Sequence, residues 1–366
     1  MSVRVVERRL GTVPWLVVQG PAAEAFASLG AHLAAEIRAV VEGLPSLAAL
    51  RRHVASEPGR HRFAAVRRAT QSRFPGPWAE LAALAAGAGV GLDDLALLNF
   101  RGDLGVTEPD PAGAGAGCSD LAWRRQRSFI AHNEDEPDFF AGRCALLTLA
   151  LDDQQPVATF AKPGFLPATT FTVTGSGLVW GIDHMQARSP GPGAGRHFAA
   201  RGLQLAASSV DQAISYLREH PSAGGFACTI GDRAGRIVAV ESSAGQHAWR
   251  EIGANGPVGW HTNHGRYVTG ADASPHGTSL RRGNVLAALD IPADEPEPGW
   301  FLRVLTSPPP DGVRAKPTGA DRTTTLCTFV ADLTGNQATI VAQDAEPVTV
   351  PLSSLTSCGP SAWVTA

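Results

Sequence analysis

The sequence lacks the cysteine patterns that build disulfide frameworks or structural zinc sites. Its 366 residues include only five cysteines, an odd and widely spaced set with no CxxC pair. Disulfide-stabilised domains and zinc sites need paired cysteines at short, regular spacings. The set therefore argues against both, and it is typical of a protein from a reducing cytoplasm, which is where we expect this one.

Also missing are long apolar segments and an excess of charge. The amino-terminal stretch MSVRVVERRLGTVPWLVV has no apolar core of the length that a signal peptide needs, about 7 to 15 residues. No later run reaches the roughly 20 apolar residues of a membrane-spanning helix. The net charge of −3 gives no electrostatic attraction to nucleic acid or to an anionic membrane. We therefore expect neither as a partner.

What is present changes in character about a third of the way along the chain. Residues 1–20 predict one or two short strands, and residues 21–98 repeat apolar side chains at the three- and four-residue steps of helices. Residues 105–117, GVTEPDPAGAGAG, contain two prolines and four glycines and predict an exposed loop. Short strand patterns dominate from residue 118 onward, with helices expected near residues 196–220 and 279–290.

The first two strands after this loop predict a hairpin that carries polar side chains. The pattern is CSDLAW–RRQR–SFIAHNED, which brings Asn133 and Asp135 back close to Cys118. Because side chains alternate along a strand, Asn133 and Asp135 share one face. A turn of two or four residues would give that face to Cys118 as well, and a turn of three residues would give it the opposite one. The sequence leaves both registers open.

A second polar cluster lies in GWHTNHGRY, residues 259–267. His261, Asn263 and His264 are costly to bury without hydrogen-bond partners. They form either a polar loop with local hydrogen bonds or a functional site. A metal ion would need more ligands than the two histidines provide, so we predict no metal.

Four stretches together resemble one enzyme family: LLNFRGDL just before the loop, the Gly117-Cys118 junction, AHNED at 131–135, and HTNH at 261–264. They are similar to the acyl-coenzyme A:isopenicillin N/6-aminopenicillanic acid acyltransferase family. Its members are cysteine N-terminal-nucleophile hydrolases and include β-alanyl-amine hydrolases. The resemblance extends from about residue 20 to about residue 350. It implies an α+β fold, a four-layer αββα sandwich, and no cofactor.

The resemblance also implies that the chain cuts itself between Gly117 and Cys118. An acyl shift onto the thiol, followed by hydrolysis, needs an exposed peptide that can bend, which glycine permits. Cleavage would release a mostly helical segment, residues 1–117, from an αββα catalytic domain, residues 118–366, and we expect the two fragments to stay associated. Cys118 would then carry a free α-amine, whose pKa of about 7.7–8.0 lets it take the thiol proton at neutral pH.

Four residues match positions of the family with catalytic roles. Cys118 matches the nucleophile, and Asn263 matches an asparagine that stabilises the oxyanion of the tetrahedral intermediate. Asp135 matches a carboxylate that orients the new amine. Arg314 matches a family arginine by its ten-residue lead over the final hairpin pattern TTLCTFVAD, and Arg322 competes for that role or is a turn residue.

Five further polar residues are expected to line the substrate pocket. Relatives often carry an asparagine where Asp183 stands, so the pair Asp183 and His184 either favours a cationic or hydrogen-bonding substrate or only ends a strand. The expected pocket residues are Asn133, Asp183, His184, His261 and His264.

The sequence therefore predicts an amide hydrolase of small N-acyl amines that works through a thioester on Cys118, with a small acyl amide or thioester as substrate. One alternative is an acyl-CoA-dependent N-acyltransferase of the penicillin type, because both reactions pass through the same thioester. Another is a non-catalytic binding protein that retains the fold. The glycines of GSGLVWG, residues 175–181, depart from the dinucleotide-binding spacing, and no G-x-S-x-G supports a serine hydrolase.

Overall fold

The fold is described from a computed structural model of the chain. It covers residues 2–105, 117–185, 187, 190–268, 278–319, 321–343 and 345–359. Most of the predicted loop, residues 106–116, lies outside the described residues.

The larger of two sheets has nine strands, in the order β1-β2-β5-β6-β7-β8-β9-β10-β11. Neighbouring strands run antiparallel except for β2 and β5, which are parallel. The strands are β1 (Arg4–Leu10), β2 (Val13–Gly20), β5 (Ala145–Leu151), β6 (Val157–Ala161), β7 (Thr172–Thr174), β8 (Val179–Met185), β9 (Gly225–Gly231), β10 (Ile237–Ser243) and β11 (Gln246–Glu251).

The second sheet has six antiparallel strands, in the order β12-β3-β4-β13-β14-β15. They are β12 (Val258–His261), β3 (Ser119–Arg124), β4 (Ser128–Pro137), β13 (Thr323–Asp332), β14 (Gln337–Ala342) and β15 (Val348–Pro351). Strands β3 and β4 face β8 of the larger sheet. Phe171 stacks on Phe329 between the sheets, with ring centroids 4.0 Å apart.

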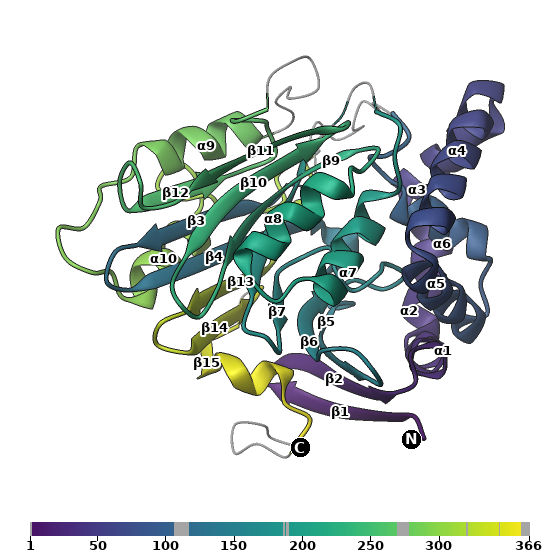
Figure 1. The fold of residues 1–366 in the computed structure, drawn as a ribbon, viewed down its shortest axis with the longest axis horizontal. Helices are drawn as coiled ribbons and strands as arrows, with labels where there is room; N and C mark the ends of the chain where they lie inside the picture. Colours follow the sequence, from purple (N-terminus) through teal and green to yellow (C-terminus); the bar gives the residue numbers. More distant parts are fainter. Residues whose placement is uncertain are drawn as a thin grey trace.

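Helices cover the outer faces of both sheets (Figure 1). The apolar sides of α7 and α8 pack on β8, β9 and β10, whereas α9 and α10 pack on β3, β4 and β13. The predicted α+β four-layer αββα sandwich is therefore confirmed. The helices are α1 (Ala22–His32), α2 (Ala34–Gly43), α3 (Pro45–Ala55), α4 (Glu57–Arg73), α5 (Pro75–Ala88), α6 (Leu92–Asn99), α7 (Arg196–Ala206), α8 (Val210–Glu219), α9 (Ser279–Ala287) and α10 (Pro298–Thr306), with short 3-10 helices η1 (Asp138–Phe140) and η3 (Leu352–Thr356).

Proline and glycine explain several of the boundaries between the helices of the amino-terminal segment. Pro45 and Pro75 open α3 and α5, because the first turn of a helix tolerates a residue without an N–H. Gly89 ends α5 in the left-handed conformation, with φ at 67°. Ser209 caps α8, and its side chain accepts the N–H of Gln212. None of the helices in the described part of the chain is long and apolar enough to cross a membrane.

The amino-terminal segment is built into the sandwich as well as lying beside it. Its hairpin of β1 and β2 forms one edge of the nine-stranded sheet, where β2 pairs with β5. Trp15 on β2 is buried and donates to Thr148 Oγ1 on β5 at 2.9 Å. Helices α1 to α6 gather on one side of the molecule (Figure 1). Residues 1–117 and 118–366 thus share one hydrophobic core.

Candidate active site

The β3–β4 hairpin has the three-residue turn that the sequence left open. Ser119 pairs with Asn133 and Arg124 with Ser128, so the turn consists of residues 125–127. Cys118, one residue before Ser119, therefore points to the opposite face from Asn133. Asn133 and Asp135 face the α9–α10 layer, where Asn133 Nδ2 donates to the carbonyl of Leu305 at 2.8 Å.

The thiol of Cys118 faces a different pair of β4 residues, His132 and Glu134. It is 6% exposed, and Sγ donates to Glu134 Oε2 at 3.5 Å. The same carboxylate oxygen lies 3.3 Å from His132 Nε2, and His132 Nδ1 lies 2.7 Å from Asp120 Oδ1. All these side chains are buried. Gly181 on β8 allows the Asp120 carboxylate to lie close to that strand, since a Cβ at residue 181 would overlap the carboxylate.

A buried lysine extends this chain of contacts. Lys162 is one of only two lysines in the sequence. Its Nζ lies 2.5 Å from Glu134 Oε1 and 2.6 Å from Glu136 Oε1. Arg101 completes the line by pairing with Glu136. Paired in this way, the buried carboxylates keep partners for their charge, as burial requires.

Burial and hydrogen bonds set the protonation states around the thiol. Burial, with the Glu134 charge, raises the pKa of Cys118 to about 12. Burial alone would lower the pKa of His132, but hydrogen bonds to Asp120, Cys118 and Glu134 outweigh it and raise that pKa well above its usual value. At neutral pH the thiol is therefore protonated and His132 is an imidazolium.

The LLNFRGDL stretch connects the amino-terminal helices to this network. Arg101 pairs with Glu136, and Asp103 Oδ1 accepts the main-chain N–H of Gly224 at 2.7 Å. Asp103 also accepts the N–H of Arg196 at 3.2 Å, at the start of α7. Burial raises the pKa of Asp103 to about 7, against the opposing charge of Arg196. A stretch quoted above for its resemblance thus has a structural role.

The Gly117-Cys118 junction, where the resemblance implies cleavage, lies between Asn263 and an arginine of α9. A Cβ at Gly117 would overlap the Arg282 guanidinium and the Asn263 amide oxygen. Asn263 is buried, and its Oδ1 accepts from Arg282 Nη2 at 2.6 Å. Arg282 Nη1 donates to the carbonyl of Cys118 and, at 2.8 Å, to Ser119 Oγ. Arg282 therefore contacts both residues of the dipeptide, and Asn263 lies against Gly117.

Asp135 lies beside the same junction through its main chain. The N–H of Gly117 donates to the carbonyl oxygen of Asp135 at 3.1 Å. The Asp135 carboxylate is buried and accepts from Thr325 Oγ1 at 2.6 Å. Burial raises its pKa to about 7, and the charge of Arg282 acts in the opposite direction.

Sequence reasoning missed Arg282, although a signal was present. Residues Ser279, Arg282, Gly283 and Leu286 recur at helical spacing and form the buried side of α9. An arginine on the buried stripe of a helix needs a partner, and this one finds Asn263 and the carbonyl of Cys118.

The histidine stretch contributes a second buried network next to β8. His261 Nδ1 lies 3.2 Å from Asp183 Oδ2, and its Nε2 lies 2.9 Å from Glu241 Oε1. These hydrogen bonds overcome burial and raise the pKa of His261 to about 9. Burial, with the nearby Asp120 charge, raises the pKa of Asp183 to about 6.

The remaining predicted residues each contact a neighbouring residue; they are His184, His264, Arg314 and Arg322. His264 Nδ1 lies 2.8 Å from Ser279 Oγ, and the carbonyl of His184 accepts from Asn263 Nδ2 at 2.8 Å. Arg314 Nη2 donates to the carbonyl of Gln343 at 3.2 Å. Arg322 is exposed and pairs with Asp138. The catalytic role of Arg314 stays a prediction.

Two groups of side chains around the thiol have the donor atoms of metal sites. They are Cys118, His132 and Glu134, and Asp120, His132 and Asp183, with ligand atoms within 4.8 Å of one another in each group. His132 takes part in both groups, and both of its nitrogens already face carboxylates. The Lys162 ammonium supplies the positive charge that a metal would bring. We therefore assign these residues to hydrogen bonds and ion pairs.

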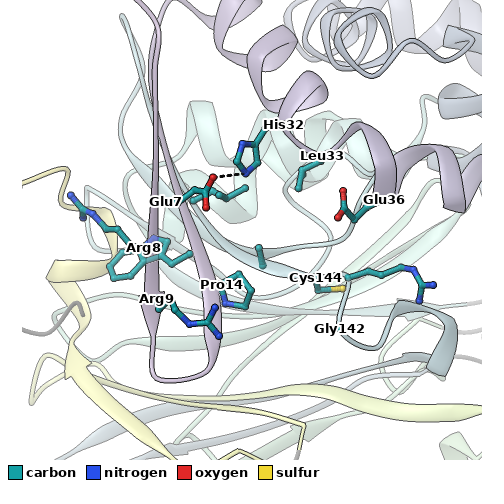
Figure 2. A pocket seen from close by; sticks show the side chains of 13 residues that line it. Glu7, Arg8, Arg9, Pro14, His32, Leu33, Glu36, Gly142 and Cys144 are labelled. Atoms are coloured by element: carbon teal, nitrogen blue, oxygen red, sulfur yellow. Dashed lines mark ion pairs between the residues drawn. The ribbon is translucent and has the colours of Figure 1, made fainter. Parts of the chain in front are cut away.

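A separate cavity of about 330 Å³ opens between the β1–β2 hairpin, the α1–α2 junction and the turn before β5 (Figure 2). Its lining includes Glu7, His32 and Cys144, and the predicted site residues are not among those that line it. Glu7 and His32 form an ion pair at 3.7 Å. Burial raises the pKa of the Cys144 thiol, which makes it a poor nucleophile.

One protein family and several solved structures are similar to this chain. The sequence profile described as acyl-coenzyme A:6-aminopenicillanic acid acyl-transferase matches residues 123–346, more than half of the chain. A search of curated proteins found no match. Among solved structures, a mutant conjugated bile acid hydrolase from Clostridium perfringens is similar with a TM-score of 0.39 and 13% identity, over 66% of this chain and 94% of that one. Penicillin V acylase from Agrobacterium tumefaciens has a TM-score of 0.38 and 13% identity, over 64% and 84% of the two chains.

Proposed function

Since the chain belongs to the acyl-coenzyme A:6-aminopenicillanic acid acyl-transferase family, we propose that Cys118 is its nucleophile and that the chain activates it by cutting the Gly117-Cys118 bond. One observation carries this proposal. The Gly117-Cys118 dipeptide lies against the Arg282 guanidinium and the Asn263 amide, and the thiol of the same cysteine lies in a network of ionisable groups. A cation and the thiol thus lie beside the same dipeptide.

The proposed reaction of the processed enzyme begins at the free α-amine of Cys118. The amine takes the thiol proton, and the thiolate attacks the acyl carbon of an amide substrate. Negative charge then develops on the substrate oxygen, and the Asn263 amide N–H and the Arg282 cation are the groups proposed to stabilise it. For this, Asn263 Nδ2 has to exchange its hydrogen bond to the His184 carbonyl for one to the substrate, while Oδ1 keeps Arg282 as its partner. Collapse expels the amine and leaves a thioester on Cys118, which water or a second amine resolves.

Asp135 is the proposed residue that positions the new amine. The hydrogen bond from the Gly117 N–H to the carbonyl of Asp135 supports this, because it holds residue 135 beside the bond to be cut. Arg314 keeps its proposed role only on the resemblance. Arg282 is the stronger candidate for the cation of the site, since it contacts Cys118 and Asn263 together.

Self-cleavage is the direct test. We expect purified chain to resolve into fragments of 117 and 249 residues, the second being 366 minus 117. The Cys118→Ala variant should stay whole. Denaturing electrophoresis and intact-mass measurement separate these results, and a wild-type chain that stays whole through prolonged incubation would disprove the proposal.

We propose that water is the usual acceptor of the acyl group and that the enzyme is chiefly an amide hydrolase of small N-acyl amines. In support, Gly175 and Gly177 of GSGLVWG lie in the turn between β7 and β8, where Gly177 has a φ of 92°, and Gly181 lies within β8. These glycines therefore serve a hairpin and give no support to a coenzyme A site. An acyltransferase must also hold a second amine in place of water.

The choice between hydrolysis and transfer is measurable. A panel of N-acyl amines is supplied with and without a second amine, and free acid and new amide are quantified. We expect free acid to dominate at modest amine concentration. New amide as the main product would identify a transferase instead.

A further inference from the structure

The first cut poses a problem that the α-amine cannot solve. Before cleavage, the nitrogen of Cys118 belongs to the peptide bond with Gly117, so no amine exists to take the thiol proton. The pKa of Cys118, raised to about 12 by burial, keeps that proton in place at neutral pH. The uncleaved chain, if it processes itself as proposed above, therefore needs another proton acceptor.

The contacts of the thiol identify one. Glu134 Oε2 accepts the Cys118 S–H at 3.5 Å, and both side chains are almost completely buried. The other carboxylate oxygen is occupied by the Lys162 ammonium at 2.5 Å, which leaves Oε2 as the oxygen that faces the sulfur. We propose that Glu134 is the acid–base residue of self-cleavage, which takes the Cys118 thiol proton and returns it to the Cys118 nitrogen.

The proton and electron balance of this step closes within the chain. The S–H proton moves to Glu134 Oε2, and the thiolate attacks the carbonyl carbon of Gly117 to form an S–C bond. As the C–N bond breaks, its electron pair stays on the nitrogen, which takes the proton back from Glu134. The product is a thioester between Gly117 and the Cys118 sulfur with a free amine, and water then hydrolyses it.

His132 supports this transfer from the same face of β4. Its Nε2 lies 3.3 Å from Glu134 Oε2, and its Nδ1 is held by Asp120 at 2.7 Å. As an imidazolium, His132 donates a proton to neither neighbour but stabilises the thiolate while Glu134 is neutral. The local net charge is the same before and after the transfer, which avoids creating an unpaired charge in a buried site.

Asp135 and Glu136, the two carboxylates that follow Glu134 on β4, have other hydrogen-bond and ion-pair partners. Asp135 lies on the opposite face of β4 and accepts from Thr325. Glu136 shares the face of Glu134 and also contacts Lys162, at 2.6 Å, but its second partner is Arg101. Glu136 is therefore a matched control, because it has the same charge, strand face and lysine partner.

The experiment compares the self-cleavage rates of full-length wild type, Glu134→Gln and Glu136→Gln by denaturing electrophoresis and intact mass. Glutamine keeps the size of Glu134 but cannot accept the proton. We expect Glu134→Gln to cleave roughly 10²-fold or more slowly than wild type, the usual scale for loss of a general base. Glu136→Gln should cleave within a few-fold of wild type.

Hydroxylamine identifies the affected step, because it cleaves a thioester without needing the protein to activate water. If Glu134 acts in the acyl shift, hydroxylamine leaves Glu134→Gln whole. Cleavage of that variant by hydroxylamine at the wild-type rate would show that the thioester forms without Glu134 and would overturn the inference. Equal slowing of Glu136→Gln would also overturn it, since charge loss would then explain the effect.

Two further results distinguish loss of proton transfer by Glu134 from a folding defect and from failure of the proposed function. Glu134→Asp retains a carboxylate, and we expect it to cleave faster than Glu134→Gln at equal thermal stability. A folded Glu134→Asp that is as slow as Glu134→Gln counts against proton transfer. A wild-type chain that never cleaves rejects the proposed function itself, whereas rapid cleavage by Glu134→Gln rejects only the role of Glu134.

Discussion

At Cys118 two chemically different surroundings meet on opposite faces of one strand. The thiol faces His132 and Glu134, whereas the carbonyl oxygen of the same residue accepts a hydrogen bond from Arg282. This division follows from the three-residue turn of the β3–β4 hairpin. A turn one residue longer or shorter would have exchanged the two faces. The length of this turn therefore decides which side chains of β4 lie beside the Cys118 thiol.

Asn263 gives the residue-scale prediction. We expect Asn263→Ala to reduce turnover by about 10²–10³, the usual loss when one oxyanion donor is removed. Turnover is measured on processed enzyme with the best N-acyl amine from the panel. Asn284→Ala, on the exposed side of α9, is the matched control and should keep wild-type turnover. Near-normal activity of Asn263→Ala in an assay that Cys118→Ala abolishes would exclude the oxyanion role.

The residues of the candidate site were only partly predictable from the sequence. AHNED pointed to β4, but this stretch is polar on both faces, so periodicity could not say which residues would meet the thiol. Lys162 gave no signal, because a lone lysine after the apolar strand β6 has the pattern of a strand end. Its place is fixed by Glu134 and Glu136, which become its neighbours only when the two sheets pack together.

The elements of the amino-terminal segment bear directly on whether the two fragments of the proposed cleavage would stay associated. Strand β2 pairs with β5 along its length, and Trp15 is buried against Thr148. Cutting at residue 117 leaves these contacts intact, because both partners lie away from the junction. The small fragment would have to expose its part of the common core in order to leave.

We therefore expect the 117- and 249-residue fragments to elute as one species in native size-exclusion chromatography. Denaturant should separate them, since their contacts are non-covalent. Recovery of a folded large fragment without the small one, in native buffer, would contradict this expectation.

Most of the helices and strands could be predicted from the sequence. The helices of 21–98 and the hairpin after residue 118 are observed, because their apolar periodicity is strong. The αββα class is observed as well, but it was implied by the family resemblance and not by periodicity. Helix α10, with the sequence PGWFLRVLT, was not predicted. It is short, and its apolar residues make sense only against the face of β13 and β4 that it covers.

The whole molecule should respond to pH through its buried histidines. The pKa of His261 is about 9 in the folded chain, above its usual 6.5, so its stabilising effect is complete below pH 6.5 and is lost as the pH rises through 9. The shift corresponds to about 3 kcal/mol. Chemical denaturation of uncleaved Cys118→Ala between pH 6.5 and 9 should show the free energy of unfolding falling.

Adding His261→Gln to Cys118→Ala should make this fall shallower, because the linked proton is gone. His264→Gln is the control, since burial lowers the pKa of His264 and its proton is already lost above pH 6.5. Identical slopes for all three proteins would show that His261 is not the linked group.

The pairing of β4 with β13 has a consequence for how the protein is made. Cys118 leaves the ribosome early, yet β13, the strand that pairs with the outer side of β4, begins at Thr323, some two hundred residues later. Ser279 and Arg282, which hold Asn263, also follow late. On the proposed mechanism the nascent chain cannot cut itself during most of its synthesis, and the released amino terminus of Cys118 would mark a molecule in which α9 and β13 have already been made and packed into place.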